Sequence, residues 1–156
     1  MAPSFHSVPA VSLVFLGIDY GSKRVGLSHG DELGFAFPLA AATAPDAEER
    51  FSHIGREIAR LKVTQLVLGY PLSLEGDKTK RCLEVDAFAA ELTQRFGLPI
   101  ELVDEGLTSQ AADALSGQRK PRTSKERQDQ AKSGERDSRA AAVMLQDFLN
   151  SRGFGA

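Results

Sequence analysis

Residues 17–27 have the sequence GIDYGSKRVGL and overlap the end of an apolar run that predicts a strand at residues 11–18. The strand ends in a single carboxylate, Asp19, and two cations, Lys23 and Arg24, follow it closely. A carboxylate at this place needs a cation or hydrogen bonds to offset its loss of hydration. The neighbouring glycines let a ligand approach the backbone, and the two cations suit anionic oxygens. The stretch therefore indicates a metal or phosphate site, with a hairpin turn around one solvated aspartate as the simpler alternative.

The composition fits a single globular domain. The chain has 156 residues, of which 42% are hydrophobic and 26% charged, and its formal net charge is −2. We expect one domain at residues 11–150, a loose N-terminus at 1–10 and a C-terminal tail at 151–156. No apolar run is long enough for a membrane span, and residues 1–10 lack the blocks of a signal peptide, so we expect a cytoplasmic protein. A single cysteine, Cys82, excludes an internal disulfide and a cysteine-built zinc site.

Hydrophobic periodicity predicts an alternation of strands and helices. Strands are predicted at residues 11–18, 25–29, 34–39, 66–68 and 99–103, and helices at 46–61, 79–96, 108–115 and 134–150. A tight turn at residues 30–32 should join the second and third strands. Three strands in a meander followed by helical crossovers predict a mixed α/β sheet of five strands, three antiparallel and then two parallel, flanked by helices.

Carboxylates fall where the ligands of such sheets gather, beyond the carboxyl ends of the strands. Asp19 ends the first predicted strand, and Asp104 and Glu105 end the last. Asp137 lies in the first turn of the closing helix, on its apolar face, so we expect it to point toward the sheet. Carboxylates brought together in this way can hold Mg²⁺ or Mn²⁺, which prefer oxygen ligands. Each acid alone could equally be solvated or stabilise a helix N-terminus, so the prediction depends on their joint pattern.

Four short motifs follow one another along the chain. They are DYGSKRVG at 19–26, LGYPL at 68–72 followed by Glu75-Gly76, VDEGLTS at 103–109, and Lys132 followed by DSRAA at 137–141. Together they resemble the motifs of the YqgF family, also called RuvX, and the resemblance spans residues 13–149. Members of that family are nucleases of the ribonuclease H-like fold, related to Holliday-junction resolvases and proposed to mature the 5′ end of pre-16S ribosomal RNA.

The resemblance implies that Asp19, Glu105 and Asp137 are the catalytic acids and that they hold two divalent metal ions, Mg²⁺ or Mn²⁺. Two such ions support the hydrolysis of phosphodiester bonds. One position departs from the family, because Gly106 stands where an arginine usually follows the Asp-Glu pair. That arginine could bind phosphate or orient the acids, so its absence affects the expected rate and substrate preference.

Cations near the predicted acids suggest contacts with a nucleic-acid backbone. Between residues 119 and 139, eight lysines and arginines stand against four acids in a chain whose net charge is −2. Such a patch attracts phosphates independently of base sequence, although a solvated loop would have the same composition. The predicted nucleic-acid contacts are Lys23, Arg24, Lys78, Lys80, Arg81, Arg119, Lys120, Arg122 and Lys132, and Gly21 and Gly69 are predicted to let the backbone approach closely.

The sequence thus favours a metal-dependent endonuclease for structured nucleic acid, either four-way junction DNA or the 5′ end of pre-16S ribosomal RNA. One alternative is a nucleotide-binding module of the actin and sugar-kinase type, which also ends a strand with Asp-x-Gly but has a second domain that closes over ATP. Another is a non-catalytic nucleic-acid or ribosome-binding protein that retains the acids. A resolvase of a two-fold junction should be a homodimer. Cys82 would report on such an interface if it were exposed and would be inert if it were buried.

Overall fold

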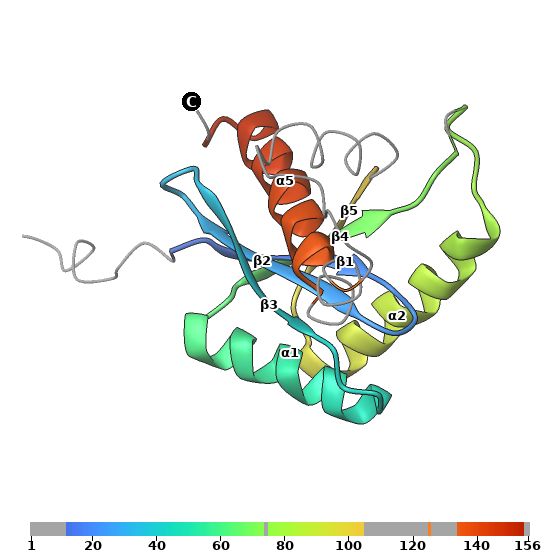
Figure 1. Cartoon of the computed structure of the whole chain (residues 1–156). Coiled ribbons are helices and arrows are strands. Elements are labelled where there is room, and N and C mark those ends of the chain that lie inside the picture. Colours follow the sequence, from blue (N-terminus) through green and yellow to red (C-terminus); the bar gives the residue numbers. More distant parts are fainter. Residues whose placement is uncertain (1–11, 74, 105–124, 126–133, 155–156) are drawn as a thin grey trace, which may run out of the picture.

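A computed structural model describes residues 12–73, 75–104, 125 and 134–154. It contains one five-stranded sheet in the order β3-β2-β1-β4-β5, with helices on both faces (Figure 1). The elements are β1 (Val14–Tyr20), β2 (Val25–Asp31), β3 (Ala36–Ala42), α1 (Ala47–Leu61), β4 (Gln65–Tyr70), α2 (Lys80–Phe96), β5 (Ile100–Asp104) and α5 (Glu135–Ser151). None of the helices in this described part of the chain is long and apolar enough to cross a membrane.

The strand directions confirm the predicted mixed sheet. β1 pairs antiparallel with β2, and β2 pairs antiparallel with β3. β4 lies parallel to β1 on its other side, and β5 lies parallel to β4. This follows from the connections, since short turns join antiparallel strands whereas the crossover helices α1 and α2 return the chain in the same direction. β1 is therefore the central strand, and its carboxyl end lies between two neighbours.

The two faces of β1 contribute to separate hydrophobic cores. Leu16 and Ile18 belong to the core beneath α1 and α2. Phe15, on the alternate face, packs with Phe148 and the other apolar residues of α5. Because successive side chains in a strand point to opposite faces, every second residue of β1 faces α5.

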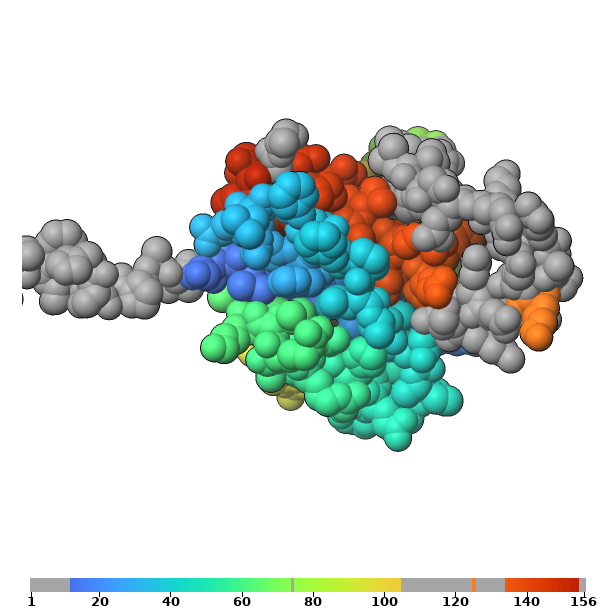
Figure 2. Space-filling model, turned by 60° about the vertical axis from the view of Figure 1, so that its left-hand side comes forward, coloured from blue at the N-terminus to red at the C-terminus, as the bar shows by residue number. Residues whose placement is uncertain are grey.

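The helix α5 packs close to β2 because that strand presents small side chains to it. Gly26, Ser28 and Gly30 lie on the α5 face, and Figure 2 shows α5 (orange to red) directly against the β2–β3 hairpin (blue to cyan). The Ser28 hydroxyl donates a hydrogen bond of 2.8 Å to the carbonyl oxygen of Ala141. The backbone N–H of Leu27 donates to the Ser138 hydroxyl at 3.1 Å. Both serines are buried, so these bonds fix α5 on the sheet without competition from water.

Replacing Ser28 with Ala should therefore weaken the packing of α5 on the sheet. We expect the free energy of unfolding to fall by about 1 kcal/mol, since a buried hydrogen bond is lost. Urea denaturation followed by circular dichroism measures this change. Ser52→Ala, at an exposed position of α1, is the matched control and should leave the midpoint unchanged. Equal midpoints for the two variants would contradict the structural role of Ser28.

Capping residues set the helix ends at the predicted places. The Asp46 side chain accepts a hydrogen bond from the backbone N–H of Glu48 at the start of α1. Thr79 is the N-cap of α2, and Gly97 ends that helix in the left-handed conformation at φ 64°. These signals are local in the sequence, and the helices predicted at residues 46–61 and 79–96 are confirmed to within one residue at each end. The helix predicted at residues 108–115 lies outside the described residues.

The predicted tight turn between β2 and β3 is present, but it starts at Asp31 rather than at Gly30, because β2 continues to Asp31. Gly30 is a strand residue whose missing side chain admits Leu149 of α5; a Cβ atom there would lie 2.9 Å from that leucine. The turn comes one step later, where the Asp31 carboxylate accepts from the N–H of Leu33 and Gly34 adopts φ 92°. The strands β1 and β3 likewise end later than predicted, at Tyr20 and Ala42 rather than at residues 18 and 39.

Candidate functional site

Asp19 lies at the carboxyl end of the central strand, on the face that α5 covers. It is opposite Gly26 in the β1–β2 ladder, and its side chain is half-buried. The position follows from the alternation of β1, since Phe15 and Gly17 on the same face both lie against α5. Asp19 is thus the last residue of a stripe that is otherwise covered by the helix.

The first turn of α5 brings Asp137 to the same end of this face. A Cβ atom on Gly26 would lie 2.2 Å from the carbonyl oxygen of Asp137, so the helix turn touches the ladder position directly opposite Asp19. Only a glycine allows this approach. Two acids separated by more than a hundred residues of sequence therefore share one end of one face of the sheet, as the sequence predicts.

The carboxylate of Asp137 is paired with Arg24 from the β1–β2 loop. The Nε atom of Arg24 donates to Oδ2 of Asp137 at 3.1 Å, and about a third of each side chain is exposed, 35% and 33%. The pair joins the loop to α5 across the open end of the site. Because the side chains are partly solvated, its contribution to folding should be modest, about 0–1 kcal/mol.

Other predicted cations and glycines occupy the same edge. Arg81, near the start of α2, donates to the backbone carbonyl of Tyr20 and so fixes the end of β1. Lys23, Lys78 and Lys80 are exposed. A Cβ atom on Gly21 would lie 2.5 Å from the carbonyl oxygen of Arg24, so this glycine closes the β1–β2 turn. Its predicted contact with a nucleic-acid backbone, like that of the buried Gly69 in β4, stays a prediction.

Part of the predicted site lies outside the described residues, namely Glu105, Gly106, Arg119, Lys120, Arg122 and Lys132. Within the described ranges, no three His, Cys, Asp or Glu side chains converge as a metal site would require. The third acid of the predicted set is Glu105. Asp104 pairs in register with Tyr70, whose side chain belongs to the α1/α2 core. Asp104 therefore lies on the opposite face of the sheet from Asp19.

Cys82 is buried, as expected for a small apolar side chain in α2. Its thiol accepts a hydrogen bond from the backbone N–H of Thr79 and serves as part of the helix cap. Burial raises the pKa of this thiol, but the hydrogen bonds from Thr79 and Tyr70 outweigh it and lower the pKa. Tyr70 is itself buried and donates to Asp86; burial first, and that bond second, raise the pKa of Tyr70 to about 12. The thiol is therefore a structural group rather than a surface reporter.

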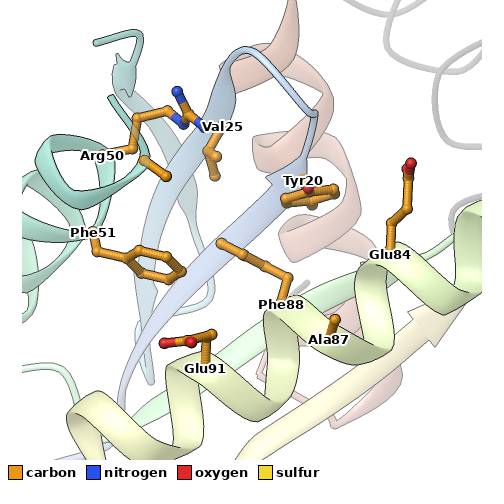
Figure 3. A pocket seen from close by; sticks show the side chains of 9 residues that line it. Tyr20, Val25, Arg50, Phe51, Glu84, Ala87, Phe88 and Glu91 are labelled. Atoms are coloured by element: carbon orange, nitrogen blue, oxygen red, sulfur yellow. The ribbon is translucent and has the colours of Figure 1, made fainter. Parts of the chain in front are cut away.

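A cavity of about 340 Å³ lies on the other face of the sheet, between α1 and α2 (Figure 3). It is lined by Tyr20, Val25, Ala47, Arg50, Phe51, Glu84, Ala87, Phe88 and Glu91. Glu84 and Glu91 are exposed on α2 and also border this cavity. The sequence contains no local signal for it, because it forms only where the start of α1 meets the middle of α2.

The strand order, the flanking helices and the acid at the end of the central strand define the ribonuclease H-like class of α/β proteins. A solved structure of the Fowlpox virus resolvase with its Holliday junction DNA shares this fold, with a TM-score of 0.52 at 12% identity over 90% of this chain and 99% of the viral one. That likeness concerns the fold alone.

The family follows from the sequence comparison. A family model described as "RuvX: Holliday junction resolvase" matches residues 13–151, and the chain belongs to this family. A relative from Opitutus terrae is 41% identical over 138 residues, covering 88% of this chain and 91% of its own length. A relative from Picosynechococcus is 36% identical over 139 residues, covering 88% and 92%. Both carry the name "Putative pre-16S rRNA nuclease".

Proposed function

We propose that this chain is a nuclease that hydrolyses phosphodiester bonds in structured nucleic acid with the help of divalent metal ions. The observation that carries the proposal is the placement of Asp19 and Asp137 on one face at the carboxyl end of the central strand, with Arg24 beside them. Family membership supports the same conclusion. It does not favour the nucleotide-binding phosphotransferase or the non-catalytic binding protein.

The donor groups present fit Mg²⁺ or Mn²⁺. Asp19 and Asp137 are half-buried carboxylates, and Asp137 is already compensated by a cation, the Arg24 guanidinium. Hard divalent ions prefer such oxygen donors. Together with Glu105, these acids would hold the metal, and two bound ions would activate water and stabilise the leaving oxygen.

The remaining residues of the site bind and orient the substrate. Arg24 and Lys23 stand on the loop that borders Asp19, where a scissile phosphate would lie, and cations there would hold its oxygens. Arg81 fixes the backbone at the end of β1 and thereby the direction of the Asp19 side chain. Hydrogen bonds from Ser28 and to Ser138 keep α5, and with it Asp137, in register with the sheet.

The two relatives favour an RNA substrate, the precursor of 16S ribosomal RNA, whereas the family description favours the four-way DNA junction. We propose the cytoplasm as its location, which suits either substrate. The deciding experiment compares cleavage of both under identical conditions, with Mg²⁺, with Mn²⁺ and with EDTA. We expect metal-dependent cleavage of at least one substrate, and no cleavage of either with either ion would overturn the proposal.

The oligomeric state separates the two substrates further. Paired cuts in a two-fold junction require a homodimer, whereas trimming one RNA end does not. Light scattering with and without a junction measures this difference directly. A chain that remains monomeric on the junction would favour single cuts, and hence the RNA precursor.

Replacing Arg24 with Gln should change metal and nucleic-acid affinity in opposite directions. Loss of the guanidinium leaves the Asp137 charge uncompensated, so Mn²⁺ should bind about two- to tenfold more tightly. The same loss removes a phosphate contact, so nucleic acid should bind more weakly by a similar factor. Calorimetry with MnCl₂ and fluorescence anisotropy with a labelled junction measure the two affinities. Arg56→Gln, at an exposed position of α1, is the control; equal affinities in both variants would contradict the prediction.

A further inference from the structure

Three aromatic rings, those of Tyr20, Phe51 and Phe88, line the cavity between α1 and α2. The Phe88 ring packs 4.5 Å from the Tyr20 ring and 5.4 Å from the Phe51 ring, measured between centroids. Phe88 is buried, whereas Tyr20 and Phe51 are only half-buried and keep part of their surface open to the cavity. Figure 3 shows Tyr20 and Glu84 at one end and Phe51 and Glu91 at the other. A volume of about 340 Å³ with this lining can take one flat ring system.

The cavity and the proposed cleavage site share the β1–β2 loop. Tyr20 follows Asp19 directly, and successive residues of a strand lie about 3.3 Å apart with side chains on opposite faces. Asp19 therefore points to α5 and Tyr20 points into the cavity. Arg50, which also lines the cavity, donates to the carbonyl oxygen of Ser22 in this loop at 3.4 Å. If the phosphate of a nucleotide lies at Asp19, on the α5 face of the sheet, its base has to pass the β1–β2 loop to reach the aromatic rings on the opposite face.

The polar groups at the rim select among flat ligands. Two of them are carboxylates, Glu84 and Glu91, and Arg95 donates to Glu91 at 2.9 Å. The third is the cation Arg50, whose guanidinium already donates to the backbone carbonyls of Ala44, Pro45 and Ser22. Ionised carboxylates only accept hydrogen bonds and repel phosphate, so the bound part of a ligand should be uncharged and rich in N–H donors. Guanine presents two N–H groups side by side on its Watson–Crick edge, which match one carboxylate. Guanine also carries the O6 acceptor on that edge, but adenine, cytosine and uracil do not offer two neighbouring nitrogen donors there, so they match a carboxylate less well.

We propose that this cavity, hereafter the base cavity, receives an unpaired guanine of the nucleic-acid strand whose phosphodiester bond lies at Asp19. The Arg95 guanidinium lies over the Phe51 ring, 4.2 Å from its centroid, so Tyr20 is the ring that stacks on the base, and a rim carboxylate accepts from its N–H edge. The inference rests on the proposed nuclease function for the identity of the strand, but the binding it describes can be measured without cleavage.

The first measurement uses the unaltered protein. Short labelled oligomers of abasic sites carry a single central guanine, adenine, cytosine or uracil, and anisotropy is measured with EDTA present so that nothing is cut. Guanine should bind at least about fivefold more tightly than the fully abasic oligomer, since stacking one base contributes this much or more. The affinities of the adenine, cytosine and uracil oligomers should lie between those of the guanine oligomer and the fully abasic oligomer.

Two tryptophan variants test the location. Ala87 and Ala90 are both exposed on α2, but only Ala87 lines the base cavity. Ala87→Trp should fill the cavity and remove the advantage of guanine over the abasic oligomer, while Ala90→Trp should keep it. Glu84→Gln and Glu91→Gln, made separately, test the edge contact; at least one should reduce the preference for guanine over adenine.

The outcomes separate the two proposals. Equal binding of guanine and abasic oligomers by a protein that still cleaves its substrate overturns the base cavity and leaves the nuclease intact. A guanine preference in a protein that cleaves nothing supports the cavity and overturns the nuclease. A preference that survives Ala87→Trp places the base elsewhere and overturns the inference.

Discussion

Replacing Asp19 with Asn should lower the cleavage rate at least about 100-fold, because the variant removes a negative metal ligand worth several kcal/mol in the transition state. The change hardly alters side-chain volume. It also relieves repulsion between Asp19 and Asp137 at the shared end of the α5 face, so the fold should persist. Single-turnover cleavage of the preferred substrate in Mn²⁺ measures the loss, and anisotropy in EDTA should show that nucleic acid still binds.

Asp147→Asn is the matched control for this result. Asp147 is exposed on α5, the helix that also carries Asp137, and lies away from the sheet edge. Its replacement should leave cleavage unchanged. The melting temperature of the Asp19 variant should remain within about 4 °C of the parent, which separates loss of chemistry from loss of folding. Cleavage near the parent rate in the Asp19 variant would remove this residue from the proposed site.

The sequence predicts those parts of the fold that depend on short stretches of chain. The apolar run before Asp19 identifies the central strand, and the caps at Asp46 and Gly97 set two helix ends. The orientation of Asp137 follows from the apolar face of one helix and is likewise confirmed, since its carboxylate meets the β1–β2 loop rather than open solvent. Each of these features is decided within a few residues, where propensity and periodicity act.

Features that join distant segments could not be predicted in this way. Arg24 is a plausible phosphate ligand in the sequence, but in the structure it pairs with Asp137, 113 residues away. Glycine is common in turns, but Gly30 is a strand residue whose missing side chain leaves room for Leu149 of α5. The base cavity is formed by the start of α1 together with the middle of α2, which are far apart in the sequence. Such contacts depend on tertiary packing, which periodicity within one element does not encode.

Replacing Gly26 with Ala should both destabilise the fold and abolish cleavage. The glycine does not need a left-handed backbone, since its φ is not positive. It is required because a Cβ atom would lie 2.2 Å from the carbonyl oxygen of Asp137 and 2.7 Å from the backbone nitrogen of Ser138. Backbone atoms cannot yield by a change of rotamer, so the first turn of α5 must move away from β2. We expect a loss of about 1–3 kcal/mol in the free energy of unfolding, as for other overpacked cores.

Gly30→Ala in the same strand and on the same face is the control. There the new Cβ atom would lie 2.9 Å from the end of the Leu149 side chain and 3.2 Å from both the end of Leu145 and the carbonyl oxygen of Phe35, so these neighbours need to shift by less than the helix backbone at Gly26. We expect a cost of about 1 kcal/mol, smaller than for Gly26→Ala, and a cleavage rate close to that of the parent. Urea denaturation gives the two stabilities, and the cleavage assay is run well below both midpoints so that each variant is folded. Under these conditions only the Gly26 variant should be inactive, because only it displaces Asp137 from the ladder position opposite Asp19. A folded, fully active Gly26 variant would show that cleavage does not depend on the close contact between the Asp137 backbone and β2.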